Sequence, residues 1–112
     1  MTRYEVTYGP EFLAAAQAAY PDQRNTRYSG PTFHDFMRVP VRSAKFAFAT
    51  NWDKLPSEMG GAVRLVILGP HWTFGPIVFY AALVSRRTGP VIEITAFEED
   101  RDYWDTFDDP DD

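Results

Sequence analysis

The chain has 112 residues, of which 45% are hydrophobic and 16% aromatic, enough apolar material for one domain with its own core. It contains no cysteine, which excludes disulfide frameworks and thiolate metal sites. Charge is unevenly distributed: residues 98–112 hold nine acidic residues and one arginine, whereas residues 1–97 hold ten basic and seven acidic residues. No secretory leader and no apolar run of about 18 residues is recognisable, so we expect a cytoplasmic protein that does not engage a membrane.

The first expected element is a strand over residues 3–8, because polar residues there alternate with aromatic or aliphatic ones. Gly9 ends this strand. Pro10 is well suited to the first position of a helix, and we expect that helix to run to residue 20.

Residues 21–31 have the composition of a polar loop, and within it Arg24, Arg27 and Tyr28 combine positive charge with an aromatic ring. The simpler interpretation is a solvated connection. The alternative is a contact with nucleic acid, in which the arginines bind phosphate and the tyrosine stacks on a base.

A second helical stretch is expected from Thr32, an N-cap residue with Asp35 three positions later in a capping-box arrangement. Pro40 is expected to interrupt or restart this helix. The next stretch predicts an apolar helical face formed by Val41, Ala44, Phe48, Trp52 and Leu55. Residues 57–61 are expected to be a flexible lead into the next strand.

Three strands are expected over residues 63–69, 76–85 and 91–99, each rich in β-branched and aromatic residues and bounded by Gly or Pro. The short connection Arg86-Arg87-Thr88-Gly89 predicts a hairpin between the last two. We therefore expect an α+β fold: an N-terminal strand, two or three helices and a three-stranded antiparallel meander, forming one sheet with helices on one face. This domain is expected to span residues 1–104, followed by an acidic tail over residues 105–112.

The loop before the second of these strands contains Trp72 and Phe74 between Gly/Pro pairs. Aromatic residues on exposed loops are common at recognition surfaces, which makes both residues candidates for partner contact. Alternatively they fold back as a lid on one end of the core.

Motifs for nucleotide binding and serine hydrolysis are absent, and His34 and His71 lack acidic neighbours at metal-ligand spacing. We expect neither a metal nor a cofactor. Arg64 is the unusual charge, because it lies inside an apolar strand. It is expected either to end in solvent at the sheet margin or to be held by an acidic partner.

This order of elements resembles the RelE/ParE superfamily of bacterial toxins, over residues 4–8, 10–13, 63–65, 78–80, 91–94 and 100–103. The resemblance implies a small toxin that is neutralised by an antitoxin and acts either as a ribosome-dependent messenger-RNA cleaver or as a gyrase inhibitor. It makes Arg64 and Tyr103 the candidate catalytic residues. Glu98 and Glu99, however, stand where the cleaving branch carries basic residues, and carboxylates there would repel RNA.

The leading hypothesis is therefore a toxin-like, protein-binding module of bacterial or phage origin that inhibits an intracellular target. Its candidate partner-binding residues are Trp72, Phe74, Arg86, Arg87, Trp104, Asp105, Asp108 and Asp109. The alternative is an acidic inhibitor or adaptor of viral or mobile-element origin whose tail mimics nucleic-acid phosphates. A third hypothesis is a degenerate ribonuclease that uses Arg64 and Tyr103.

Overall fold

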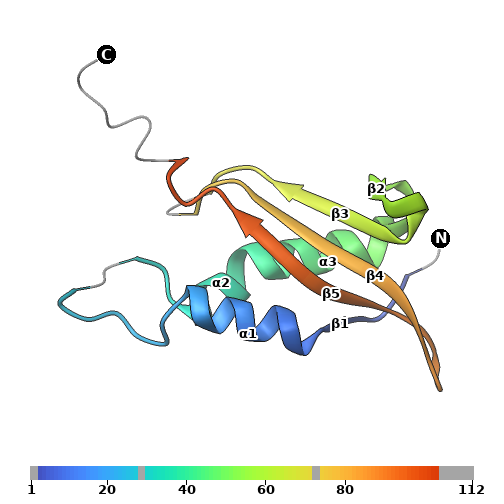
Figure 1. Cartoon of the computed structure of the whole chain (residues 1–112), viewed down its shortest axis with the longest axis horizontal. Helices are drawn as coiled ribbons and strands as arrows, with labels where there is room; N and C mark the ends of the chain where they lie inside the picture. Colours follow the sequence, from blue (N-terminus) through green and yellow to red (C-terminus); the bar gives the residue numbers. More distant parts are fainter. Residues whose placement is uncertain (1–2, 28–29, 72–73, 104–112) are drawn as a thin grey trace, which may run out of the picture.

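The computed structural model describes residues 3–27, 30–71 and 74–103. Figure 1 shows their arrangement, with the helices gathered along one side of a twisted sheet. In chain order the elements are β1 (Val6–Tyr8), α1 (Pro10–Ala19), α2 (Phe33–Phe36), the π-helix η1 (Met37–Val41), α3 (Arg42–Asn51), the 3₁₀-helix η2 (Trp52–Lys54), β2 (Ser57–Glu58), the 3₁₀-helix η3 (Met59–Gly61), β3 (Val63–Leu68), β4 (Ile77–Arg86) and β5 (Gly89–Glu99). The predicted α+β class is confirmed.

The strands form one mixed sheet in the order β1-β5-β4-β3-β2. β1 runs parallel to β5, whereas the β2–β3, β3–β4 and β4–β5 pairs are antiparallel. The expected three-stranded antiparallel meander is therefore part of a larger, mixed sheet. No orientation was predicted for the first strand, and its parallel pairing with β5 is possible because a long connection that includes the helices separates the two strands. In addition, the segment expected to be a flexible lead contains β2 and pairs with the sheet edge.

Backbone conformation explains why β2 forms. Met59, Gly60 and Gly61 have φ angles of 53°, 69° and 95°, in the left-handed region that glycine adopts without penalty. They reverse the chain tightly enough for Glu58 to pair with Val63. The sequence predicted a flexible segment here, whereas in the structure the two glycines form a sharp turn.

The hairpin of β4 and β5 is the longest feature of the sheet. Arg86 pairs with Gly89, whose φ angle of 119° accommodates the two-residue turn. The register shifts between Tyr80 and Ala81, and such a bulge increases the local twist of the pair. The hairpin tip extends beyond the helical layer (Figure 1).

The core lies between the sheet and the helices, and Phe36 is at its centre. This ring is fully buried and lies 4.6 to 6.3 Å, centroid to centroid, from five other rings. The five rings belong to Phe12, Tyr20, Phe74, Phe79 and Phe97. Of the predicted apolar helical face, Val41, Ala44, Phe48 and Trp52 are buried and Leu55 is partly buried.

The second helical stretch begins with the predicted capping box. The Thr32 hydroxyl accepts a hydrogen bond from the Asp35 amide at 3.2 Å, and the Asp35 carboxylate accepts one from the Thr32 amide at 3.0 Å. Pro40 does not break this stretch. Instead it lies inside η1, a π-helical segment whose wider turn accommodates a residue that cannot donate a backbone hydrogen bond.

Within residues 3–27, 30–71 and 74–103, no helix has both the length and the apolar character that crossing a membrane would require.

Candidate functional site

The outer face of the sheet, on the side opposite the helices, carries an apolar surface. The strand register places its side chains in three rows that run from β3 through β4 to β5: Val63, Ala82 and Glu93; Leu65, Tyr80 and Ala96; and Ile67, Val78 and Glu98. We call these nine residues the outer face. Because side chains alternate along a strand, the rows that pack on the helices are the ones in between.

Several side chains of the outer face remain accessible to solvent. Ile67 exposes 65% of its surface, whereas its neighbour Val66, which points toward the helices, exposes 5%. No helix of the described chain packs on this side (Figure 1). An apolar sheet surface without a covering layer is a common feature of protein-binding sites.

Carboxylates border the outer face. Glu98 and Glu93 end two of its rows on β5, and Glu58 pairs with Val63 at the other edge. Arg86 is the basic residue that contacts this border, where it forms an ion pair of 2.8 Å with Glu93. The border is therefore predominantly acidic.

Tyr80 connects the apolar centre of the outer face to this acidic border. Its hydroxyl donates a hydrogen bond of 3.0 Å to the carboxylate of Glu98. That bond, together with the negative charge of Glu98, raises the pKa of Tyr80 above its usual value. The hydrogen bond orients the Tyr80 side chain, which presents an amphipathic ring to a partner.

A second polar cluster lies where β5 ends, next to the core. Glu99 is half-buried, and its carboxylate accepts hydrogen bonds from the Tyr20 hydroxyl and from the Gly75 amide at 3.2 Å. Arg101 covers Tyr20, with its guanidinium 4.7 Å from the ring centre, and donates to the Ala19 carbonyl at 2.9 Å. Burial raises the pKa of Glu99 above its usual value.

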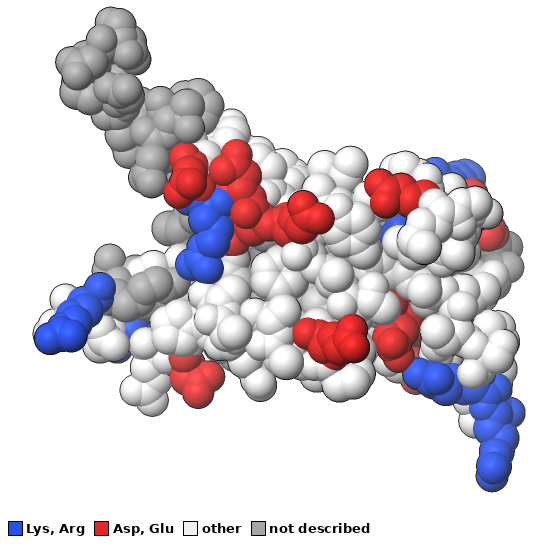
Figure 2. Space-filling model, viewed as in Figure 1, with Lys and Arg blue, Asp and Glu red and all other residues white. Residues whose placement is uncertain are grey.

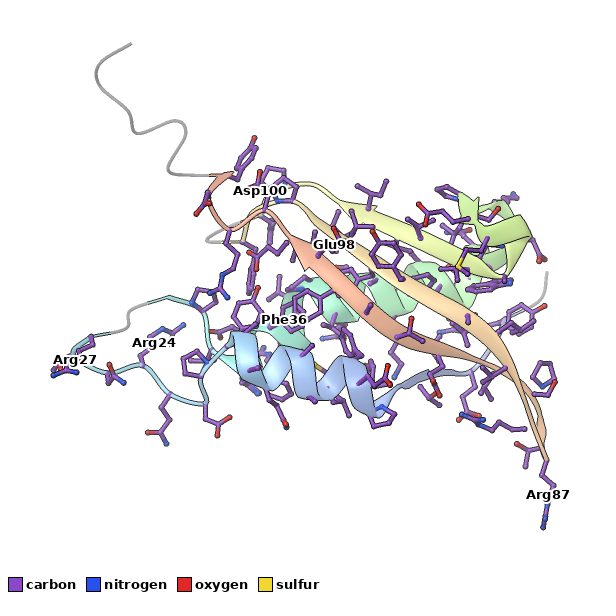
Figure 3. All side chains as sticks on the ribbon, in the orientation of Figure 1. Arg24, Arg27, Phe36, Arg87, Glu98 and Asp100 are labelled. Carbon is purple, nitrogen blue, oxygen red and sulfur yellow. The ribbon has the colours of Figure 1, made fainter. Side chains whose placement is uncertain are left out.

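Exposed carboxylates gather beside this cluster. Asp100 and Asp102 are exposed and follow Glu98 and Glu99 directly. Figure 2 shows the acidic side chains together at this end of the molecule, and Figure 3 places Glu98 and Asp100 where β5 leaves the sheet. The acidic run that the sequence identified thus begins on the folded domain itself.

The guanidinium of Arg64 makes contacts within the folded domain. Its Nη1 donates hydrogen bonds to the carbonyl oxygens of Asp53 at 3.3 Å and Leu55 at 3.0 Å, and its guanidinium lies 5.6 Å from the centre of the Trp52 ring. These contacts satisfy carbonyl groups at the end of the helical segment. The expectation of solvent or an acidic partner is therefore corrected: backbone carbonyls and an aromatic ring hold Arg64.

Tyr103 lies far from Arg64. Tyr103 lies next to Gly75, because a Cβ atom added at Gly75 would be 3.1 Å from the Cβ atom of Tyr103. Arg64 lies opposite Ala81 of β4 instead. The six residues from Gly75 to Ala81 correspond to about 20 Å along an extended chain. The structure does not bring the two candidate catalytic residues together.

For Phe74 the structure selects the second of the two alternatives, in which the residue packs on one end of the core. Phe74 is 2% exposed and packs against the rings of Tyr20 and Phe36, because the loop folds back onto the end of the core. It offers no surface to a partner. Trp72 lies outside the described residues, as do the remaining partner and nucleic-acid candidates Tyr28, Trp104, Asp105, Asp108 and Asp109.

The basic candidates lie at two distant ends. Figure 3 shows Arg24 and Arg27 on a projecting loop and Arg87 at the hairpin tip, on the opposite end of the molecule. Arg24 forms an ion pair with Asp35, which ties it to the start of α2. The structure therefore does not combine these arginines into one basic surface.

A hollow of about 310 Å³ lies beside η1, and Ser43 and His71 contribute to its lining. Trp72 and Thr73, on the same loop, are outside the described residues, and we assign this hollow no ligand. Among the side chains that the structure describes, no group of three or more His, Asp or Glu residues is arranged to hold a metal ion.

No protein-family model matches the chain, and neither a curated protein nor a solved structure matches it. The resemblance to RelE/ParE toxins therefore remains a prediction.

The outer face was not predictable from the sequence. Every second residue of β3 belongs to it, but apart from Arg64 both faces of this strand are apolar, so an alternation of polar and apolar residues could not identify the open face. Only the strand pairing and the position of the helices distinguish the covered face from the open one.

Proposed function

We propose that this chain is a small protein-binding module that inhibits an intracellular target, and that it binds its partner through the outer face of the sheet. The observation that carries the proposal is the apolar surface on the side of the sheet without helices, where Ile67 is exposed and Val78 and Tyr80 are half-buried. A partner that buried this surface would remove apolar area from water, the main driving force of protein association.

The acidic border specifies the chemistry of the partner. Glu58, Glu93 and Glu98 favour a partner whose apolar surface is flanked by lysine or arginine. A second copy of this chain presenting the same face would bring carboxylates of its own. We therefore infer a different protein, in agreement with the toxin-like hypothesis, in which the partner is an antitoxin or an inhibited target.

Inducible expression in a bacterial host tests this proposal. Wild-type chain should arrest growth, and the variant Ile67→Lys/Val78→Lys should not, because two charges would enter the contact surface without a partner. Leu83→Lys is the matched control. Leu83 is also an exposed aliphatic residue of the sheet, 41% accessible, but it lies outside the three rows.

Arrest by the control but not by the double variant supports the proposal, provided that circular dichroism shows all three proteins folded. Absence of arrest by wild type would contradict an inhibitory function. Equal arrest by wild type and the double variant would exclude the outer face as the contact surface.

A second candidate function has one observation in its favour. The exposed carboxylates of Glu98, Asp100 and Asp102 gather where the acidic tail begins, and such a cluster can imitate the phosphates of a nucleic acid toward a basic protein site. In this case the full chain with Asp105→Asn, Asp108→Asn and Asp109→Asn would lose growth arrest, whereas the outer-face variant would retain it. The same assay therefore separates the two candidates.

A further inference from the structure

A groove of about 480 Å³ separates the segment that leads into β1 from α3, on the helical side of the molecule. Three cationic side chains contribute to its lining, those of Arg3, Arg42 and Lys45, together with the ring of Phe46. Glu5 is the acidic residue of the lining, so the groove has an excess of positive charge.

Helix geometry explains how α3 presents this surface. Arg42, Lys45 and Phe46 follow at spacings of three and four residues and therefore share one side of the helix. Ala44 and Phe48 lie on the other side and are fully buried in the core. Phe46 exposes 62% of its surface beside the two charges, a combination that favours an acidic ligand containing aromatic groups.

The positive charges of the groove are not neutralised within the described part of the chain. Arg42 and Lys45 form no ion pair with any carboxylate there. The Lys45 ammonium instead lies 5.6 Å from the centre of the Tyr8 ring. An incoming carboxylate would therefore not have to displace an existing salt bridge.

Residues 104–112 of this chain have the complementary chemistry. They comprise five aspartates and the aromatic residues Trp104 and Phe107, with no basic residue. We propose that this acidic segment of one copy binds the basic groove of a second copy. The carboxylates would face Arg3, Arg42 and Lys45, and an aromatic ring would pack on Phe46.

Distance along the sheet favours a second copy over the same one. Val6, at the groove, pairs with Ile92, and Glu99 follows seven residues later, about 23 Å further along β5. The chain then turns, because the Tyr103 amide donates to the Asp100 carbonyl. Asp105, Asp108 and Asp109 follow Tyr103 by two, five and six residues, reaches of about 7, 17 and 21 Å in an extended chain, and fall short of this distance. Only the last two aspartates, Asp111 and Asp112, are within reach of the groove of their own copy.

The contact joins two different surfaces and is therefore heterologous. Each copy offers one groove and one acidic segment, so wild-type chains would associate head to tail, reversibly and with increasing concentration. Because the contact is mainly electrostatic and exposed, salt should weaken it. This self-association is independent of the outer face and would occupy the acidic segment that the second candidate function requires.

Sedimentation velocity on purified full-length proteins tests the proposal. Wild type should associate at about 50 mM salt and dissociate at about 500 mM salt. The groove variant Arg42→Glu/Lys45→Glu and the tail variant Asp105→Asn/Asp108→Asn/Asp109→Asn should each associate at least about tenfold more weakly. The control Arg27→Glu/Arg87→Glu changes net charge as the groove variant does, at exposed arginines outside the groove, and should associate as wild type.

Mixing the two defective variants gives the decisive measurement. The groove variant keeps a wild-type tail and the tail variant keeps a wild-type groove, so an equimolar mixture should form a 1:1 complex that neither protein forms alone. A wild type that remains monomeric at low salt would overturn the proposal, whether its tail binds its own copy or the groove binds an acidic segment of another protein. So would self-association of either variant at wild-type strength, or a mixture that stays monomeric.

Discussion

The Tyr20 hydroxyl donates a hydrogen bond to the Glu99 carboxylate, which joins the end of α1 to the end of β5 across 79 positions of sequence. Tyr20 is 1% exposed and Glu99 half-buried, so a carboxylate reaches into the margin of the aromatic core. The stability of this end of the domain should therefore respond to pH.

The first prediction concerns the variant Glu99→Gln. Burial raises the pKa of Glu99 in the folded protein above its value in the unfolded chain, about 4.3, so folding favours the protonated form. The folded state binds more protons in this window, and the contribution of Glu99 to stability increases as pH falls from the folded pKa toward the unfolded one. As pH falls across this interval, the unfolding free energy of wild type should increase relative to that of Glu99→Gln.

Urea unfolding of wild type and Glu99→Gln at several pH values between about 4 and 7 measures this difference. Glutamine keeps one oxygen to accept from Gly75 and gains an amide to donate to Tyr20, so the variant should fold. Glu98→Gln is the control, since it removes the same charge on the exposed neighbour. A difference in unfolding free energy between wild type and Glu99→Gln that does not change with pH would contradict the prediction. If Glu98→Gln shows the same pH dependence as Glu99→Gln, the effect is due to net charge.

The second prediction concerns the close approach at Gly75. A Cβ atom there would lie 2.0 Å from the Asp100 carbonyl oxygen, which is a backbone atom that cannot rotate away. Gly75→Ala should therefore lower the unfolding free energy by about 2 kcal/mol or more. Gly69→Ala is the matched control, because a Cβ at Gly69 meets nothing within 4 Å. Thermal unfolding of both variants gives the comparison. Equal melting temperatures would contradict the prediction, because they would show that the segments containing Gly75 and Asp100 can move apart without loss of stability.

The third prediction assigns a structural role to Arg64. Arg64→Met keeps an apolar stem against Trp52 but removes the hydrogen bonds to the Asp53 and Leu55 carbonyls. We expect a loss of about 2 kcal/mol in unfolding free energy, since hydrogen bonds from a charged donor to two backbone carbonyls are lost. Arg87→Met, at the exposed hairpin tip, should change stability by no more than about 0.5 kcal/mol. An Arg64→Met variant as stable as wild type, but impaired in an RNA-cleavage assay, would instead favour the ribonuclease hypothesis.

The fourth prediction concerns the capping box at the start of α2. Thr32→Val keeps the shape of the side chain but removes the oxygen that accepts from the Asp35 amide, and should cost about 1 kcal/mol. The hydrogen bond from the Thr32 backbone amide is the main cause that lowers the pKa of Asp35. The stabilisation by the Asp35 carboxylate should therefore be present above its unfolded pKa and be lost as pH falls through the lowered folded value.

Chemical denaturation of wild type, Thr32→Val and Asp35→Asn at neutral and acid pH tests this pair. The cost of Asp35→Asn should shrink toward acid pH, in the direction opposite to the response expected for Glu99. A cost that grows on acidification would be incompatible with a carboxylate held in its charged form.

Much of the local structure was predictable from the sequence. The capping box, the helix start at Pro10 and the turn at Gly89 depend on neighbouring residues and on fixed backbone preferences, so a short window contains their cause. Pro40 shows the limit of this reasoning. Its missing amide predicts an interruption, but packing of Val41 and Phe48 in the core stabilises a continuous helical run through a π-turn.

The candidate site was harder to predict from the sequence, because the solvent exposure of a side chain depends on which elements pack over it in the folded domain. Phe74 has the sequence context of an exposed loop residue, yet the loop folds onto Tyr20 and Phe36. Ile67 has the context of a core residue, yet it faces solvent on the side of the sheet without helices. The same side-chain chemistry had opposite outcomes at these two positions.

The sequence by itself determined the α+β class, the order of the main helices and strands, and the separation of an acidic end from a mildly basic remainder, because composition, periodicity and turn residues act locally. Tertiary structure alone decided the parallel pairing of β1 with β5, the carbonyl partners of Arg64, and which face of the sheet stayed open. These depend on contacts between residues far apart in the chain, where the free energy of burying one surface competes with that of burying another.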